Sequence, residues 1–348
     1  LAEVQQAVYA PMNYVLPSRI QKYEDLYGTE TSSGRFKQQD RETALQSLMT
    51  TNLLKRLESS VDAFRISLQN MEERIHQTLE NIKQFEQTGG TQQASGINVD
   101  EGFDDEDASH YTEGKIQIDF ADMDLPSWKR DLETDHTLML MLREEMEKIS
   151  PQHDSKLQHL KAHILDKVNS PINAGNRKVV IFTAFADTAK YLYQQIASEL
   201  KALSIDSAMV TGSDQAKTTL GNGFDYQKIL TFFSPISKDK ALIYPESSEQ
   251  IDILIGTDCI SEGQNLQDCD YLINYDIHWN PVRIIQRFGR IGETAAHPRS
   301  AKNHHMVAIF AKESIGRNIT ATLPSRLLNN LITAGRIRKF IHPSCTPR

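Results

Sequence analysis

Short apolar runs separated by amphipathic stretches occupy the second half of the chain, and this alternation constrains the fold most. The clearest runs are Val179–Phe182, Ile251–Ile255 and Tyr271–Tyr275. A helix is predicted between the first two, over Thr188–Leu203. Strands that alternate with helices build a parallel sheet covered on both faces, so an α/β fold is expected here. Three further segments are weaker candidates for sheet elements: Ala208–Val210, Lys228–Phe233 and His304–Phe310.

The first half of the chain is predicted to be mainly helical. Between Glu42 and Phe85, apolar residues recur at steps of three and four, which predicts one long helix with an apolar stripe. The stripe comprises Leu54, Leu57, Val61, Phe64, Leu68, Met71, Ile75, Leu79 and Ile82. Packing against another helix is favoured over a coiled-coil dimer. Two more helices are predicted over Leu132–Ile149 and Lys156–Val168, and His153–Asp154–Ser155 offers capping groups for the second.

The length of 348 residues fits about two domains. We expect a helical region over residues 1–150 with an acidic loop near 99–110, an α/β domain over 151–311, and a basic tail over 312–348. After Ile291 the chain has nine Lys and Arg against two Glu, a net +7 within a total of −8. This basic stretch after Ile291 is a candidate for DNA phosphate contacts, and a solvated terminus is the alternative.

No apolar run approaches the roughly 20 residues of a membrane span, and no signal peptide is apparent. The three cysteines, at 259, 269 and 345, lack metal-ligand spacing and are expected to be inert thiols in a cytoplasmic protein. The first residue is Leu1, so the chain is expected to be a fragment.

Three segments follow predicted strands, where the chemistry of parallel sheets is found. In Phe182–Thr188, hydroxyl and backbone N–H groups could meet a phosphate at a helix N-terminus; an ordinary turn capped by Asp187 or Thr188 is the alternative. In Gly256–Leu266, Gly263 permits close backbone approach, and Thr257, Ser261 and Asn265 could hydrogen-bond phosphate or ribose. A capped loop is the alternative for that segment.

The third segment runs from Asn274 to Arg290. Arg287 and Arg290 are three residues apart, so on a helix they are neighbours that could clamp phosphate oxygens. The alternative is a surface helix whose arginines pair with carboxylates, which is favoured for Arg283 alone.

In their order FTAF, TDCISEGQNL, NYD, WNP and QRFGR, these segments resemble motifs IV, V and VI of superfamily-2 helicases. SEGQNLQ and WNP are similar to the Swi/Snf branch, within which the bacterial remodeller that recycles RNA polymerase looks closest. The resemblance spans Lys156–Ile291, and Asn52–Arg65 resembles helical material between the two motor domains of bacterial members. It implies a RecA-like helicase C-terminal domain.

The resemblance also implies roles for individual residues. Arg290 matches an arginine finger that reaches ATP held by a first motor domain, flanked by Gln286 and Arg287. Gly263, Asn265 and Glu262 match the nucleotide-contacting segment, and Thr183, Thr257 and Ser261 match or adjoin DNA contacts. ATP with Mg²⁺ is the implied cofactor, and double-stranded DNA and a first RecA-like domain are the implied partners.

The sequence departs from the family pattern in two ways. The chain has no G-x-x-x-x-G-K-[ST] phosphate loop and no motif II, so it is predicted not to hydrolyse ATP by itself. Glu293 stands where the family has a second motif VI arginine. A disrupted or frame-shifted end, a divergent tail, and omitted residues are the open explanations. A degenerate module that binds nucleic acid or protein, and half of an RNA helicase, are the rival functions.

Overall fold

The computed structural model describes residues 4–31, 34–88, 93–94, 117–212, 214–260, 264–276, 281–291 and 305–308. The chain divides into two compact units, Leu1–Ile149 and Ser150–Arg348. None of the described helices is long and apolar enough to cross a membrane.

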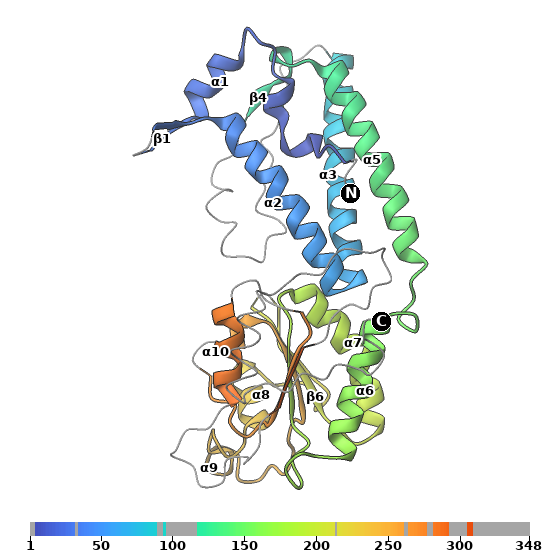
Figure 1. Cartoon of the computed structure of the whole chain (residues 1–348), viewed down its shortest axis with the longest axis vertical. Coiled ribbons are helices and arrows are strands. Elements are labelled where there is room, and N and C mark those ends of the chain that lie inside the picture. Colours follow the sequence, from blue (N-terminus) through green and yellow to red (C-terminus); the bar gives the residue numbers. More distant parts are fainter. Residues whose placement is uncertain are drawn as a thin grey trace, which may run out of the picture. The chain divides into compact units, whose positions relative to one another are not determined.

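The first unit is mainly helical (Figure 1). Its helices and 3₁₀ turns are η1 (Ala7–Tyr9), η2 (Pro11–Tyr14), α1 (Ile20–Tyr27), α2 (Gln38–Ser59), α3 (Val61–Thr88), η4 (Phe120–Asp122) and α5 (Leu125–Glu147). Its strands form two short antiparallel pairs, β1 (Thr29–Thr31) with β2 (Gly34–Phe36) and β3 (Gln93–Ala94) with β4 (Ile118–Asp119).

The prediction of a single helix over Glu42–Phe85 is wrong, because the helix is interrupted at Ser60. Ser60 is extended, with φ −154° and ψ 150°, and ends α2. Its hydroxyl oxygen accepts the Ala63 N–H at 3.0 Å, so the same residue caps the start of α3. Local hydrogen bonds from a serine compete with helix continuation, and here they prevail. The expected helix-on-helix packing is present, since α3 packs against both α2 and α5.

Buried carboxylates hold the N-terminal segment onto these helices. Asp135, on α5, accepts the N–H groups of Gln5 and Ala7, both at 2.8 Å. Glu42, on α2, accepts the Met12 N–H at 2.9 Å. Because these N–H groups have no helical partner, the carboxylates satisfy donors that would otherwise be buried without a hydrogen bond.

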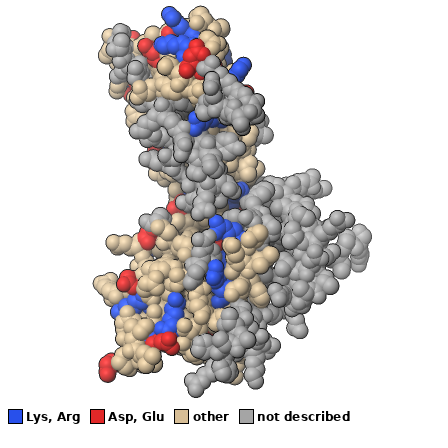
Figure 2. Space-filling model, turned by 90° about the vertical axis from the view of Figure 1, so that its left-hand side faces the viewer, with Lys and Arg blue, Asp and Glu red and all other residues tan. Residues whose placement is uncertain are grey.

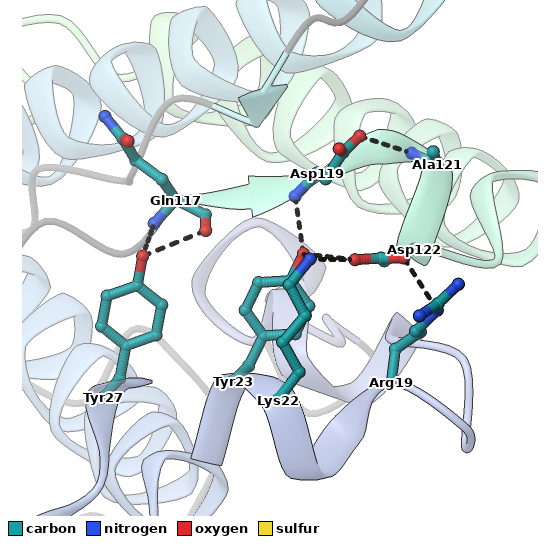
Figure 3. Close-up of polar contacts among 8 residues, drawn as sticks. All are labelled: Arg19, Lys22, Tyr23, Tyr27, Gln117, Asp119, Ala121 and Asp122. Carbon is teal, nitrogen blue, oxygen red and sulfur yellow. Dashed lines mark hydrogen bonds and ion pairs between the residues drawn. The ribbon is translucent and has the colours of Figure 1, made fainter. Parts of the chain in front are cut away.

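Two tyrosines of α1 hold the segment around β4 in the same way (Figure 3). The Tyr27 hydroxyl accepts the Gln117 N–H at 3.0 Å, and the Tyr23 hydroxyl accepts the Asp119 N–H at 3.0 Å. Tyr23 then donates to Asp122 at 2.8 Å, and Lys22 donates to the same carboxylate at 2.6 Å. One face of α1 therefore fixes the backbone of residues 117–122.

The second unit is a six-stranded sheet between helices, as expected for a RecA-like fold (Figure 1). The strands are β5 (Val179–Phe182), β6 (Ser207–Val210), β7 (Lys217–Thr218), β8 (Ile253–Gly256), β9 (Tyr271–Asn274) and β10 (His305–Ala308). Their order is β10-β9-β5-β8-β6-β7, and every pair is parallel except β6 with β7.

The helices of this unit cover both faces of the sheet. They are α6 (Ser155–Asn169), α7 (Ala186–Ala202), α8 (Tyr226–Phe233), α9 (Lys240–Ile243), η5 (Asp258–Ile260) and α10 (Pro281–Ile291). Alternate residues of β5 enter two cores, Val179 and Ile181 with α6 and α7, and Val180 and Phe182 with α8 and α10. Strands buried on both faces explain the uninterrupted apolar runs of the sequence.

Two local predictions have opposite outcomes. Asp154 does cap α6, because its carboxylate accepts the Leu157 N–H at 3.0 Å. The segment Lys228–Phe233 lies in helix α8, where Asp225 accepts the Lys228 N–H at 2.8 Å as the N-cap. A short apolar run does not distinguish a buried strand from a buried helix. The aspartate that precedes this run, at a position where it can cap a helix, is the feature of the sequence that indicates a helix.

Candidate functional site at the carboxyl ends of the strands

The three sequence segments with polar chemistry meet at one edge of the sheet. Thr183, Thr257 and Tyr275 are the residues that follow β5, β8 and β9, which are parallel neighbours in the sheet. Their carboxyl ends therefore lie side by side, where ligand sites of open α/β sheets form. The turn after Phe182 is not capped by Asp187 or Thr188, because α7 begins at Ala186 with Phe185 as its N-cap and without a side-chain cap.

Thr183 and Asp276 join the ends of β5 and β9. The Thr183 hydroxyl donates to the Asp276 carboxylate at 2.6 Å, and the Ala184 N–H donates to its other oxygen at 2.7 Å. Thr183 is fully buried and Asp276 is nearly so. The donors that were expected to meet a DNA phosphate therefore face a carboxylate of the same chain. A DNA contact by Thr183 stays a prediction, and it would require Asp276 to give up these hydrogen bonds.

Arg287 joins the ends of β8 and β9 to α10. Its Nε and Nη2 atoms donate to the two oxygens of Asp258 at 2.7 and 3.0 Å, and Nη1 donates to the Asn274 side-chain oxygen at 2.9 Å. The guanidinium carbon lies 5.2 Å from the centre of the Phe182 ring. Paired hydrogen bonds to a carboxylate give the guanidinium one fixed orientation.

Arg287 and Arg290 lie in different surroundings, and the paired clamp expected from them stays a prediction. Arg287 has no exposed surface, whereas Arg290 is half-buried in the last turn of α10. The Arg287 guanidinium is directed into the domain because Asp258 and Asn274 satisfy it there. Gln286 is exposed on the same helix. The catalytic roles expected for Arg290 and Gln286 stay predictions.

The segment after β8 carries the other expected contacts. Thr257 is half-buried, and its hydroxyl lies 3.4 Å from the Cys259 sulfur. Asn265 is exposed, and its side-chain oxygen accepts the Gln267 N–H at 3.1 Å. The Leu266 N–H donates to the Arg290 carbonyl at 3.1 Å, which ties this segment to the end of α10. Ser261, Glu262 and Gly263 lie outside the described residues.

Close packing behind the site requires Gly256. A Cβ at this position would lie 2.5 Å from the Ile260 Cδ1 atom and 3.1 Å from the Val210 carbonyl oxygen. Ile260 has no exposed surface, so it has little room to move away. Gly256 therefore lets η5 fold directly over the end of β8, which places Asp258 beside Arg287.

The two described cysteines are free thiols with raised pKa values, as expected for inert thiols. Burial raises the pKa of Cys259, and it raises the pKa of Cys269 to about 12. Cys345 lies outside the described residues. In the described part of the chain, no group of three or more His, Cys, Asp or Glu side chains could hold a metal ion.

The sequence motifs indicate the arginines and hydroxyls of the site but not the acids that bind them. Asp258 and Asp276 each stand within two residues of a strand end, in the TDC and NYD segments. The sequence around these two acids does not indicate their hydrogen-bond partners, because Arg287 lies 29 residues from Asp258 and Thr183 lies 93 residues from Asp276. A polar residue directly after an apolar strand was the available indication.

Residues 155–294 match the family described as helicase conserved C-terminal domain. YqhH, named as an ATP-dependent helicase of Bacillus subtilis strain 168, is 55% identical over 100 residues, which cover 26% of this chain and 17% of that protein. Fml2 of Schizosaccharomyces pombe, named as an ATP-dependent DNA helicase, is 27% identical over 142 residues, 41% of this chain and 16% of that protein.

The matched regions therefore span less than a fifth of either relative. Among solved structures, the chain is similar to the C-terminal part of the Fun30 ATPase domain, with 14% sequence identity. The superposition covers 95% of this chain and 90% of the Fun30 chain. Its TM-score of 0.33 is too low to bear on function.

Proposed function

Because residues 155–294 match the family described as helicase conserved C-terminal domain, we propose that this chain is the C-terminal motor half of an ATP-dependent DNA translocase of the Swi/Snf type. It supplies motifs IV, V and VI to an ATP and DNA site that a separate RecA-like domain completes. The observation that carries the proposal is the meeting of all three motif segments at one sheet edge, with Arg290 half-buried in the last turn of α10.

In this proposal, the C-terminal motor half stabilises the negative charge that develops during phosphoryl transfer. Phosphoryl transfer depends mostly on positioning and on neutralising the charge that develops on the phosphoryl oxygens. Arg290 is the residue that would approach those oxygens, since the Arg287 guanidinium is hydrogen-bonded to Asp258. ATP would supply the transferred phosphoryl group, and the described residues fit only one wall of its site. The Mg²⁺ ligands and the phosphate loop belong, in this proposal, to the separate domain.

DNA binding would fall to the loops at the strand ends. On the face shown in Figure 2, Lys and Arg side chains reach the surface at several points, with Asp and Glu among them. Hydroxyl and backbone N–H groups of loops are among the groups that contact DNA phosphates. Thr257 and the neighbouring Ser261 are the proposed phosphate contacts. Closing and opening of the two motor domains would then move the protein along the duplex.

A test needs the two-motor protein, in which this chain is joined to the first RecA-like domain. We expect ATP hydrolysis stimulated by double-stranded DNA, and weaker stimulation by duplex RNA. Equal or stronger stimulation by RNA would favour half of an RNA helicase instead.

Glu293 favours a second candidate, because it replaces the second arginine of motif VI. A degenerate domain would bind nucleic acid or a protein without hydrolysing ATP. Its DNA affinity would not depend on nucleotide and would be unchanged by Arg290→Ala. DNA affinity of the two-motor protein, measured by fluorescence anisotropy with ADP and with a non-hydrolysable ATP analogue, separates the candidates: a translocase changes affinity between the two states.

A further inference from the structure

A polar cavity lies at the amino ends of the central strands of the second unit. Its volume is about 330 Å³, near the lower end of the range for small-molecule sites. Its walls are formed by the loop before β5 (173–178), the turn after α8 (235–237), and the residues before β8 (250 and 252) and β9 (267 and 268). Lys178 directly precedes β5 and Thr183 directly follows it. The whole length of a strand therefore separates this cavity from the candidate site at the carboxyl ends.

Hydrogen bonds within the protein hold the walls of the cavity in place. The Asp268 carboxylate accepts the N–H groups of Ile236 and Ser237, at 2.6 and 2.9 Å. The Asn176 side chain donates to the Asp268 carbonyl at 2.9 Å and accepts the Lys178 N–H at 3.0 Å. The Lys178 ammonium group donates to a backbone carbonyl at 2.8 Å. The cavity is therefore preformed, and the charged groups of Asp268 and Lys178 are used by the fold itself.

Two other charged groups of the lining are poorly matched within the protein. Asp252 directly precedes β8 and is only 5% exposed. Among the described residues, its carboxylate accepts one hydrogen bond, from the Gln250 side chain at the long distance of 3.4 Å. The Arg177 Nε atom is buried, and no described group accepts a hydrogen bond from it. Because buried polar groups are nearly always hydrogen-bonded, a partner from outside the chain is expected for both.

The charges of these two groups indicate the charge of that partner. Burial raises the pKa of Asp252, although the nearby cations Lys178 and Arg177 lower it, so the carboxylate lacks full compensation for its lost hydration. An anion such as phosphate would suit Arg177 but would be repelled by Asp252, and a simple cation would have the opposite difficulty. A small molecule that has one charge of each sign suits both groups.

We propose that this cavity binds a free α-amino acid with an uncharged side chain, whose ammonium group meets Asp252 and whose carboxylate meets Arg177. Guanidinium and carboxylate groups form strong, charge-assisted hydrogen bonds, and Pro235 and Ile236 offer apolar surface to the ligand's side chain. A nucleobase is a poorer match, because bases commonly stack on aromatic rings and none of the described residues that line the cavity is aromatic. The inference does not rest on the proposed function.

The first experiment uses this chain and the standard L-amino acids as probes, each titrated singly and followed by NMR. The amide signals of Lys178 and Ser237, in two walls of the cavity, report binding. We expect at least one uncharged amino acid to shift both signals with a Kd of about 1 mM or lower. Shifts at neither amide with any uncharged amino acid would overturn the proposal, as would binding confined to acidic or basic amino acids.

Derivatives of the amino acid that binds most tightly test the two charges of the ligand. N-acetylation removes the ammonium charge, and conversion of the carboxylate to an amide removes the negative charge. Each change should weaken binding by at least about tenfold, because hydrogen bonds to charged groups are the stronger ones. An acetylated or amidated derivative that binds as tightly as the free amino acid would show that the cavity does not select a zwitterion.

Asp252→Asn and Arg177→Gln test the two protein groups, and each should weaken binding by at least about tenfold. Asp239→Asn is the matched control. Asp239 is exposed, it is not among the described residues that line the cavity, and asparagine tolerates its φ of 49°. This variant should keep the parent Kd within about twofold, as expected for a surface substitution. Thermal unfolding verifies that all three variants fold, and parent-like affinity in folded Asp252→Asn and Arg177→Gln proteins would overturn the proposal.

Discussion

At the residue scale, buried or partly buried carboxylates recur as the groups that organise both units. Asp258 and Asp276 fix the strand ends of the second unit, and Asp135 and Glu42 fix the N-terminal segment of the first. Burying a carboxylate is costly unless hydrogen bonds compensate it. The two members of the first unit show that cost, because desolvation raises the pKa of both Asp135 and Glu42.

Glu42 makes the stability of the first unit dependent on pH. Burial raises its pKa to about 8, against an ordinary 4.5. The folded state therefore binds more protons than the unfolded state between these values, so stability falls as pH rises from about 4.5 to 8. The loss is on the order of 5 kcal/mol at most, at roughly 1.4 kcal/mol for each tenfold change in proton affinity. Glu42→Gln, which has no proton to lose, should remove this slope.

The measurement is urea unfolding at pH 5, 7 and 9. Trp128 is buried in the first unit and reports its unfolding, provided that the chain's other tryptophan, Trp279, is replaced by Phe. The stability difference between Glu42→Gln and the parent should grow with pH in favour of the variant. Parallel pH profiles for the two proteins would show that Glu42 does not carry the effect.

At the scale of elements, the strand–turn–helix junction after β8 depends on Gly256. Gly256→Ala should destabilise the second unit by about 1–3 kcal/mol, because the added methyl would overlap the buried Ile260. Gly289, in the middle of α10, is the matched control, since a Cβ there meets nothing within 4 Å. Gly289→Ala should stabilise the unit by about 0.5–1 kcal/mol through helix propensity. Thermal unfolding followed by circular dichroism compares them; a Gly256→Ala protein as stable as Gly289→Ala would contradict the packing account.

Sequence patterns predicted elements better than they predicted boundaries and partners. The apolar runs at Val179, Ile253 and Tyr271 lie in buried parallel strands, because burial on both faces leaves a pattern in the sequence. The break at Ser60 was missed, since the apolar spacing continues through it while the backbone does not. Arg287 was expected at a phosphate because helical spacing places it beside Arg290. Its inward direction depends on Asp258, which only the folded chain brings near.

At the scale of the whole molecule, the proposed function gives the second unit one wall of an ATP site, and the sequence contains no phosphate loop. The chain without a first motor domain should therefore show no ATP hydrolysis in a phosphate-release assay. Hydrolysis that persists through purification and disappears in Arg290→Ala would contradict this expectation. Activity that Arg290→Ala leaves unchanged would point to a contaminating ATPase.

In the proposed function, Arg290 completes an ATP site held by another domain. In the two-motor protein, Arg290→Ala should lower DNA-stimulated kcat by roughly 10³-fold or more, the loss expected for an arginine finger, while ATP still binds. Arg283→Ala, on the same helix, is the matched control and should keep kcat within about threefold. ATP turnover of the three proteins is measured at saturating duplex DNA. We expect loss only in Arg290→Ala, and equal turnover in Arg290→Ala and wild type would show that Arg290 is not an arginine finger.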